Sequence, residues 1–388
     1  MIRNIALLAA SQGLLLTNGI TMIAVTGLAG LALAPDPRLA TLALTCYVVG
    51  GALTTLPAAF FMRRFGRSAG FMLSAAMGVL ACILCATAVY NRSFLLLCLG
   101  AVPAGAYNAF GQQYRFAAAD AADPTWKSRA ISFTLAGGIL GGVIGPEISK
   151  LTRNLLEPAF VATYAALAAI ALLAMLLTSR LRIPPLSAAQ QQTSGRSLAE
   201  IARQPDYLIA VLAATCGYGV MNLLMTATPI AMDICRHPFS DAAFVLQWHV
   251  IGMFAPSFFT GSLIKRFGVL TIIAIGTLLM FACIGVALAG VSVMHFWWAL
   301  FLLGVGWNFL FVGGTTLLTE TYRPEEKAKA QGTNDFVVFG VQGLTSLSSG
   351  ALITHQGWEV LNQAALPALA VTLVLVGVYR WRRRSRTG

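Results

Sequence analysis

The chain has 388 residues, of which 57% are hydrophobic and only 10% are charged, and its mean hydropathy is +0.76. A water-soluble domain of this size does not carry so few charges, and apolar runs near 20 residues long recur from end to end. These runs are continuous rather than alternating, which excludes a membrane β-barrel. The composition therefore predicts an all-α polytopic membrane protein.

Twelve apolar segments are predicted to span the membrane as helices. They form two groups of six, so we predict an N-terminal six-helix bundle at 1–180 and a C-terminal six-helix bundle at 207–388. The polar residues between them, 181–206, are expected to be a cytoplasmic linker with a short surface helix around 196–203. The predicted spans are 5–33, 39–62, 68–90, 94–118, 130–149, 159–178, 207–232, 242–264, 269–290, 295–318, 334–354 and 361–380.

The 26 Lys and Arg residues are distributed unevenly between the predicted loops. Basic residues concentrate on the cytoplasmic side of membrane proteins, so both termini are predicted to be cytoplasmic. Most of the basic residues then lie beside the anionic lipid of the cytoplasmic leaflet. This placement explains the net charge of +12 without a nucleic-acid partner. With this orientation all but five basic residues are cytoplasmic, the five being Arg38, Arg92, Lys150, Arg153 and Arg236.

A short basic sequence occurs at the same place in each predicted half. Residues 61–67, after the second span, read Phe-Met-Arg-Arg-Phe-Gly-Arg, and residues 261–268, after the eighth, read Gly-Ser-Leu-Ile-Lys-Arg-Phe-Gly. Parallel repeats of this kind are typical of transporters whose two halves rock about a central substrate path.

These two loops resemble the signature Gly-x-Leu-(Ala/Ser)-Asp-Arg-x-Gly-Arg of the major facilitator superfamily and its echo in the second half. The resemblance implies the major facilitator fold and a secondary transporter of the bacterial inner (cytoplasmic) membrane. It also implies a monomer, the usual state in that superfamily. Arg63 and Lys265 occupy the acidic position of the signature, and Ala59 replaces its first glycine. The acidic residue helps to latch the cytoplasmic gate in the superfamily, so other contacts are expected to do so here.

The sequence contains no pattern typical of an enzyme. It lacks a phosphate-binding glycine-rich loop with a lysine, paired catalytic carboxylates and a His-Glu-x-x-His motif. We therefore predict that the chain is not an enzyme and binds no resident cofactor. Acidic residues within the spans are scarce, and Asp335, Glu147 and Asp233 lie near span ends, where we expect water to solvate them.

Spans seven and eight each carry a pair of potential soft metal ligands. Met221 and Met225 are four residues apart, as are His249 and Met253, so each pair shares one helix face. The short polar turn between the spans makes them antiparallel neighbours. Met225 and His249 then lie about 12 Å in from that turn, and Met221 and Met253 lie about 18 Å in. Thioether sulfur suits Cu(I), although methionine also fills gaps in helix packing.

Three further residues lie toward the predicted outer side of the membrane. Cys235 and His237 occupy the turn just beyond span seven, and Cys46 lies about 10 Å into span two. These side chains could pass a Cu(I) ion inward, or Cys46 could be an ordinary small buried residue.

The Met-x-x-x-Met and His-x-x-x-Met pair resembles that of the CcoA-like copper importers, a bacterial branch of the superfamily that supplies copper for cytochrome oxidase assembly. This resemblance implies import of copper as the transported substrate, with Met221, Met225, His249 and Met253 as its ligands. Riboflavin importers of the same broad branch are similar across this region. The alternative interpretation is therefore an importer of riboflavin or another small aromatic solute.

In that alternative, aromatic side chains would stack on the solute and amides would hydrogen-bond its edges. The candidate aromatic residues are Trp248, Trp307, Tyr107 and Phe254, and the candidate amides are Asn108, Gln247 and Asn308. A second alternative is a drug–proton antiporter, because residues 141–146, Gly-Gly-Val-Ile-Gly-Pro, resemble a motif of helix 5 in that group. The later glycine pair of the motif is missing, so these glycines are expected to serve helix packing first.

Overall fold

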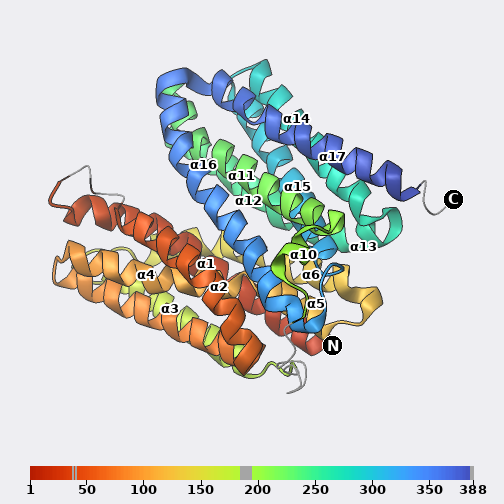
Figure 1. Ribbon diagram of the computed structural model, residues 1–388. Coiled ribbons are helices and arrows are strands. Elements are labelled where there is room, and N and C mark those ends of the chain that lie inside the picture. Colours follow the sequence, from red (N-terminus) through yellow and green to blue (C-terminus); the bar gives the residue numbers. More distant parts are fainter. Residues whose placement is uncertain (37–38, 40–41, 184–194, 385–388) are drawn as a thin grey trace. The chain divides into compact units, whose positions relative to one another are not determined.

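The computed structural model is helical and describes residues 1–36, 39, 42–183 and 195–384 (Figure 1). The prediction of an all-α protein is confirmed. The helices group into two compact units. Unit 1 comprises Met1–Asp123, Gly137–Gly195 and Arg323–Phe336, and unit 2 comprises Pro124–Ala136, Arg196–Tyr322 and Val337–Gly388. The division into bundles at 1–180 and 207–388 stays a prediction.

Unit 1 contains seven complete helices among the described residues, together with the short 3₁₀ turn η3 (Pro324–Glu326) and the start of α16. These helices are α1 (Ile2–Leu33), α2 (Leu42–Phe65), α3 (Arg67–Tyr90), α4 (Phe94–Gly111), α5 (Tyr114–Ala121), α7 (Gly138–Thr152) and α8 (Val161–Ser179).

Unit 2 contains the remaining helices of the described chain and the 3₁₀ turn η2 (Pro124–Trp126). Helices α14 and α17 lie side by side in this unit (Figure 1). Its helices are α6 (Lys127–Ala136), α10 (Leu198–Ala202), α11 (Pro205–Ile234), α12 (Phe239–Phe254), α13 (Ser257–Phe267), α14 (Val269–Ala289), α15 (Val293–Leu318), the greater part of α16 (Lys327–Ala364) and α17 (Leu366–Arg384).

Among the described residues, ten helical stretches are long and apolar enough to cross a membrane, and the bent pair α12–α13 makes an eleventh. One of the ten, Pro324–Arg382, has 59 residues, about three times the length that a bilayer core requires. It contains two predicted spans, and the non-helical backbone of Gly357 separates them (φ 82°, ψ 179°). The described residues therefore hold ten or eleven candidate spans, one of which is long enough to contain two of the twelve predicted ones.

The predicted linker, 181–206, lies partly outside the described residues, which omit 184–194. Its expected surface helix is α10. The Ser197 hydroxyl accepts from the Glu200 backbone N–H, and the Glu200 carboxylate accepts from the Ser197 N–H. This capping box satisfies backbone donors that a five-residue helix would otherwise leave unpaired.

The glycines of the predicted fifth span pack α7 closely against α1. A Cβ at Gly137 would lie 2.0 Å from the Ala9 carbonyl oxygen, and one at Gly141 would lie 2.7 Å from the Thr17 nitrogen. Helices in lipid associate through such close backbone contacts because the hydrophobic effect gives little driving force there. The interpretation of these glycines as packing residues is confirmed.

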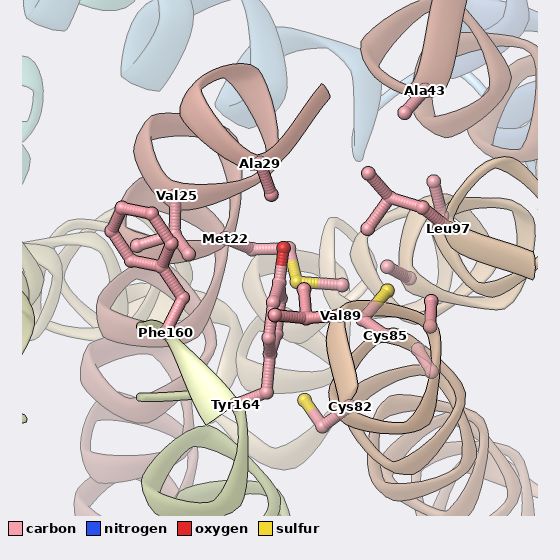
Figure 2. Packing of buried hydrophobic residues seen from close by; sticks show 14 of the residues in the cluster. Met22, Val25, Ala29, Ala43, Cys82, Cys85, Val89, Leu97, Phe160 and Tyr164 are labelled. Carbon is pink, nitrogen blue, oxygen red and sulfur yellow. The ribbon is translucent and has the colours of Figure 1, made fainter. Parts of the chain in front are cut away.

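A core of small, sulfur-bearing and aromatic side chains holds α1, α2, α3, α4 and α8 together in unit 1 (Figure 2). Tyr164 stands among Met22, Cys82 and Cys85, and its hydroxyl lies 3.0 Å from the Thr26 hydroxyl. Because the bilayer interior offers no water to a phenol, this hydrogen bond satisfies the polar end of the ring.

The repeated loop has the same backbone conformation in both units. Gly66 has φ 89° and ψ 162°, and Gly268 has φ 84° and ψ 148°. Only glycine adopts this region readily, which explains why both copies retain it. The replacement of the first glycine by Ala59 is accommodated because its α16 neighbour is Gly332. In the second copy Gly261 is retained, and a Cβ there would lie 2.5 Å from the Ser128 carbonyl oxygen.

Candidate functional site

The two helices of the predicted copper-binding hairpin, α11 and α12, both pack against a third helix of unit 2, α15. Helices α11 and α12 are in contact, but each packs far more extensively on α15 than on the other. A glycine permits the close approach of α12 and α15, because a Cβ at Gly304 of α15 would lie 2.6 Å from the His249 carbonyl oxygen and 2.8 Å from the Met253 nitrogen. Spacing arguments on the hairpin alone missed α15.

His249 is completely buried between α12 and α15. Its Nδ1 lies 2.7 Å from the Leu300 carbonyl oxygen. A carbonyl only accepts, so Nδ1 carries the proton and donates it, which leaves a lone pair on Nε2 of the neutral ring. Nε2 has no hydrogen-bond partner among the described residues. The site therefore holds one unused buried acceptor.

The three methionines of the predicted copper site differ in exposure. Met221 and Met253 are buried, and Met225 is half-buried. Burial is expected both for thioether ligands and for methionines that fill gaps, so it does not distinguish the two roles. No cluster of three or more His, Cys, Asp or Glu side chains suited to a metal occurs in the described part of the chain. The copper assignment of these residues stays a prediction.

The three residues of the predicted outer relay are distributed over both units. Cys46, on α2 of unit 1, packs against the core of Figure 2. In unit 2, Cys235 follows the last residue of α11, and His237 Nε2 donates to the Val291 carbonyl oxygen at 2.7 Å. That bond uses one ring nitrogen of His237 for a structural contact. The relay stays a prediction.

An aromatic cluster made of Tyr218, Phe254, Trp307 and Phe311 joins α11, α12 and α15. Trp307 stacks on Phe311 with centroids 5.0 Å apart, and the Tyr218 ring meets Trp307 edge-on at 5.2 Å. Phe254 also contacts Trp307 edge-on, at 5.6 Å. Trp307 and Phe254 were expected from the sequence, whereas Tyr218 was not. Tyr218 is the half-buried member of the cluster, whereas Phe254, Trp307 and Phe311 are buried.

Asn308 is not available to a solute, in contrast to the sequence expectation. Its amide nitrogen donates to the Met253 carbonyl oxygen at 2.7 Å and to the Ser257 hydroxyl, and its oxygen accepts from Thr260 at 2.7 Å. These contacts cross the break between α12 and α13, where the helix axis bends by 41°. Pro256 has no N–H, so the break needs outside hydrogen bonds inside a membrane.

The other candidates for binding an aromatic solute are dispersed. Trp248 belongs to a different group of rings, with Trp297 at 5.4 Å, and Gln247 is exposed. Tyr107 and Asn108 lie on α4 of unit 1. The Tyr107 ring is buried, and its hydroxyl has no hydrogen-bond partner within the described residues.

Buried charges in unit 1 form a connected network that sequence analysis did not predict. Arg115 and Asp335 make an ion pair in which both side chains are only 2% exposed. Gln113 Nε2 donates to the second Asp335 oxygen at 2.6 Å, and Arg67 Nη1 donates to Gln113 Oε1 at 2.9 Å. The expectation that water solvates Asp335 is therefore wrong. A buried carboxylate is stable only when paired and hydrogen-bonded, as here.

The two other acidic residues near span ends agree with the expectation. The Glu147 side chain is 57% exposed and pairs with Lys150 at 2.7 Å, and Asp233 is exposed.

Family comparison bears on the whole chain. The sequence profile of the Major Facilitator Superfamily matches residues 7–343, and a second match covers residues 237–388. The chain belongs to the Major Facilitator Superfamily. The predicted fold is thereby confirmed, and the protein is a multi-pass membrane transporter of this superfamily.

Two curated relatives are similar over most of their length. The riboflavin transporter RfnT of Brucella anthropi is 43% identical over 375 residues, which cover 96% of this chain and 94% of the relative. The uncharacterized MFS-type transporter YddS of Bacillus subtilis is 29% identical and covers 86% of this chain and 80% of its own length. The named relative carries riboflavin, and this finding gives no support to copper.

Solved structures agree on the fold. The E. coli fucose:proton symporter FucP superposes with a TM-score of 0.77 at 17% identity, over 96% of this chain and 98% of that one. The proton:xylose symporter XylE gives a TM-score of 0.79 at 13% identity, over 98% and 95%. At these identities the likeness concerns architecture alone.

Proposed function

We propose that this transporter imports riboflavin, or a flat aromatic solute of the same kind, across the bacterial inner membrane. The observation that carries the proposal is the 43% identity to a riboflavin transporter over 96% of the chain. Copper, the substrate predicted from the Met and His residues of α11 and α12, ranks second because no relative found here supports it. The cytoplasmic location of both termini and the monomeric state remain predictions.

The aromatic cluster supports a ring-shaped solute. Riboflavin carries a planar three-ring system, and aromatic side chains recognise such rings by stacking or edge contacts. The half-buried Tyr218 ring would contact the solute, while Trp307 and Phe311 hold it from behind at 5.2 and 4.8 Å. Trp307 is 1% exposed, so we assign it the positioning of Tyr218 rather than contact with the solute.

The test is uptake of radiolabelled riboflavin in a riboflavin-auxotrophic host that expresses the chain. Loss of a stacking contact is worth about 0.5–1.5 kcal/mol, so Tyr218→Ala should raise the KM about two- to tenfold. Tyr218→Phe keeps the ring and should transport normally. Membrane levels of each variant are measured to separate lost transport from lost protein.

Two results would contradict this proposal. If cells expressing the wild-type chain take up no more riboflavin than cells without it, the substrate assignment is wrong. If uptake occurs but Tyr218→Ala and Tyr218→Phe behave alike, the assignment of the stacking surface is wrong.

Copper is the second candidate, favoured by one observation in the site. His249 Nε2 is a buried, unpartnered lone pair, one helical turn from the Met253 thioether, and such a nitrogen can bind a soft metal. Copper would be the transported substrate and not a resident cofactor.

Copper accumulation in the same cells separates the two candidates. If copper is transported, Met221→Ile and His249→Leu abolish copper accumulation while the protein stays in the membrane. If riboflavin is the substrate, copper accumulation is the same with and without the chain. Riboflavin uptake by the same variants is measured in parallel.

A further inference from the structure

Two cysteines from different helices of unit 1 lie against each other, and neither has a role in the proposed transport of an aromatic solute. Cys46 of α2 and Cys98 of α4 each follow the first residue of their helix by four residues, about 6 Å along the axis. The Cys98 thiol donates a hydrogen bond to the Cys46 sulfur. Cys98 belongs to the core that Figure 2 shows in part, and Cys46 packs against that core. Both are free thiols in this structure.

The close packing of α2 on α4 explains why these two residues meet. A Cβ at Gly50 of α2 would lie 2.3 Å from the carbonyl oxygen of Val102 on α4 and 2.9 Å from its Cα. Cys46 precedes Gly50 by four residues, so it shares a helix face with that contact. Cys98 precedes Val102 by the same spacing. The two helices run in the same direction because α3 returns the chain between them, so both cysteines lie one turn from the contact and face each other.

A disulfide can join two helices only where their backbones approach closely. The Cα atoms of a disulfide lie about 4.4–6.8 Å apart, whereas the axes of ordinary packed helices lie about 8–10 Å apart. Helices that meet at a glycine, as α2 and α4 do at Gly50, come closer because no side chain separates them. The register and the close approach therefore favour a disulfide between Cys46 and Cys98.

A third thiol of this region, that of Cys85 on α3, is less suited to pair with Cys98. Its sulfur would lie 2.8 Å from a Cβ at Gly100 of α4. Gly100 is two residues from Cys98, about 200° around the helix, so Cys85 contacts a different face of α4. Cys85 is also completely buried, whereas Cys46 and Cys235 are the two cysteines of the chain that are only half-buried. Because oxidation of cysteines follows exposure, we expect an external oxidant to react at Cys46 before Cys85.

The predicted topology places the pair on the oxidising side of the membrane. With cytoplasmic termini, both α2 and α4 begin at the periplasmic face, and the two cysteines lie near those beginnings. Disulfides form and persist in the periplasm and are rare in the cytoplasm.

We propose that Cys46 and Cys98 form a reversible disulfide that joins α2 to α4. The oxidant is another disulfide, the chemical class that keeps the periplasm oxidising. The Cys46 thiolate attacks one sulfur of the oxidant and forms a mixed disulfide, and the other sulfur leaves as a thiolate. Cys98 then loses its proton, attacks the Cys46 sulfur and displaces the second thiolate. The two cysteines together give up two protons and two electrons, and the oxidant is reduced to two thiols.

The disulfide has two consequences for the protein. It ties α2 to α4 near the periplasmic face, so the oxidised protein should resist thermal unfolding better than the reduced one. It also removes the Cys46 thiolate that a metal would need, so the predicted outer copper relay could operate only in the reduced protein.

The experiment uses cells that express the full-length chain. One culture is treated with oxidised glutathione and another with dithiothreitol, both are quenched with acid, and free thiols are blocked with N-ethylmaleimide. Mass spectrometry of the digested protein then searches for the linked peptides that contain Cys46 and Cys98. The oxidised sample should contain this linked pair and two fewer blocked thiols, and the reduced sample should contain no linked pair. The thermal midpoint of protein purified in detergent should be higher after oxidation than after reduction.

Variants distinguish this pair from the other thiols. Cys46→Ser and Cys98→Ser should each abolish the difference in midpoint between the oxidised and reduced protein. Cys235→Ser is the matched control, because it removes the other half-buried cysteine, and Cys85→Ser removes the buried thiol of α3. Both controls should retain the linked pair and the difference in midpoint. The proposal is overturned if the linked pair is missing from the oxidised wild type, or if either control loses it as completely as Cys98→Ser.

Discussion

Asn308 donates a hydrogen bond of 2.7 Å to the carbonyl oxygen of Met253, at the point where the eighth predicted span breaks into α12 and α13. Lipid provides no hydrogen-bond partner for a backbone carbonyl, so a broken helix in a membrane needs one from a neighbouring helix. Asn308 of α15 supplies it. The bent span and α15 therefore depend on each other.

Replacement of Asn308 by alanine should reveal this dependence. Asn308→Ala leaves buried polar groups at the break unpaired, which should cost about 1–3 kcal/mol of folding free energy. The thermal midpoint of the purified protein in detergent measures the loss. Asn91→Ala changes an exposed asparagine just after α3 and should leave the midpoint unchanged. Equal midpoints for the two variants would show that the bend holds without Asn308.

The buried Arg115–Asp335 pair predicts strongly non-additive mutations. Either Arg115→Met or Asp335→Leu alone leaves an uncompensated buried charge and should cost about 3–5 kcal/mol. The double variant removes both charges and should be more stable than either single variant. Denaturation of all four proteins in detergent completes the cycle, and additive losses would mean that the two charges do not depend on each other.

Two glycines of unit 2 predict opposite effects of the same substitution. Gly304→Ala places a methyl group 2.6 Å from the His249 carbonyl oxygen, so α12 and α15 must separate and the protein should melt earlier. Gly377→Ala on α17 meets no atom within 4 Å and should raise stability by about 0.5–1 kcal/mol, because alanine favours helix. Thermal midpoints that shift in the same direction would contradict this account.

The repeated loop predicts matched losses in the two units. Gly66→Ala and Gly268→Ala force a side chain into a backbone region that only glycine occupies readily, at a cost of about 1–3 kcal/mol each. No atom surrounds the Gly268 position within 4 Å, so strain alone would produce its loss. Gly340→Ala, also in open space but without a positive φ, is the control. A loss at Gly340 equal to that at Gly268 would remove the conformational explanation.

Trp307 predicts a graded effect on transport. Trp307→Phe keeps an aromatic ring behind Tyr218 and should change the riboflavin KM little, whereas Trp307→Ala should raise it. The maximal rate should change less than the KM, because Trp307 positions a binding residue. Uptake measured over a range of riboflavin concentrations separates the two quantities, and a pure loss of maximal rate would argue against this role.

The sequence determined the architecture because membrane insertion depends on local properties. About 20 consecutive apolar residues suffice for a span, basic loops predict orientation, and the duplicated loop with its glycines indicates two related halves. The same reasoning predicted that the glycines of 141–145 serve packing, since small residues mark close helix contacts. It also named riboflavin, although as the alternative to copper.

Only the tertiary structure decided which polar groups are used within each unit. Arg115 and Asp335 are 220 residues apart in sequence, and His249 and Leu300 are 51 apart. A helix periodicity shows which residues share a face, but not which helix lies opposite that face. For this reason the spacing of Met221, Met225, His249 and Met253 suggested a two-helix site. In the structure α11 and α12 both pack mainly on α15, which approaches α12 closely at Gly304 and provides the partner of His249.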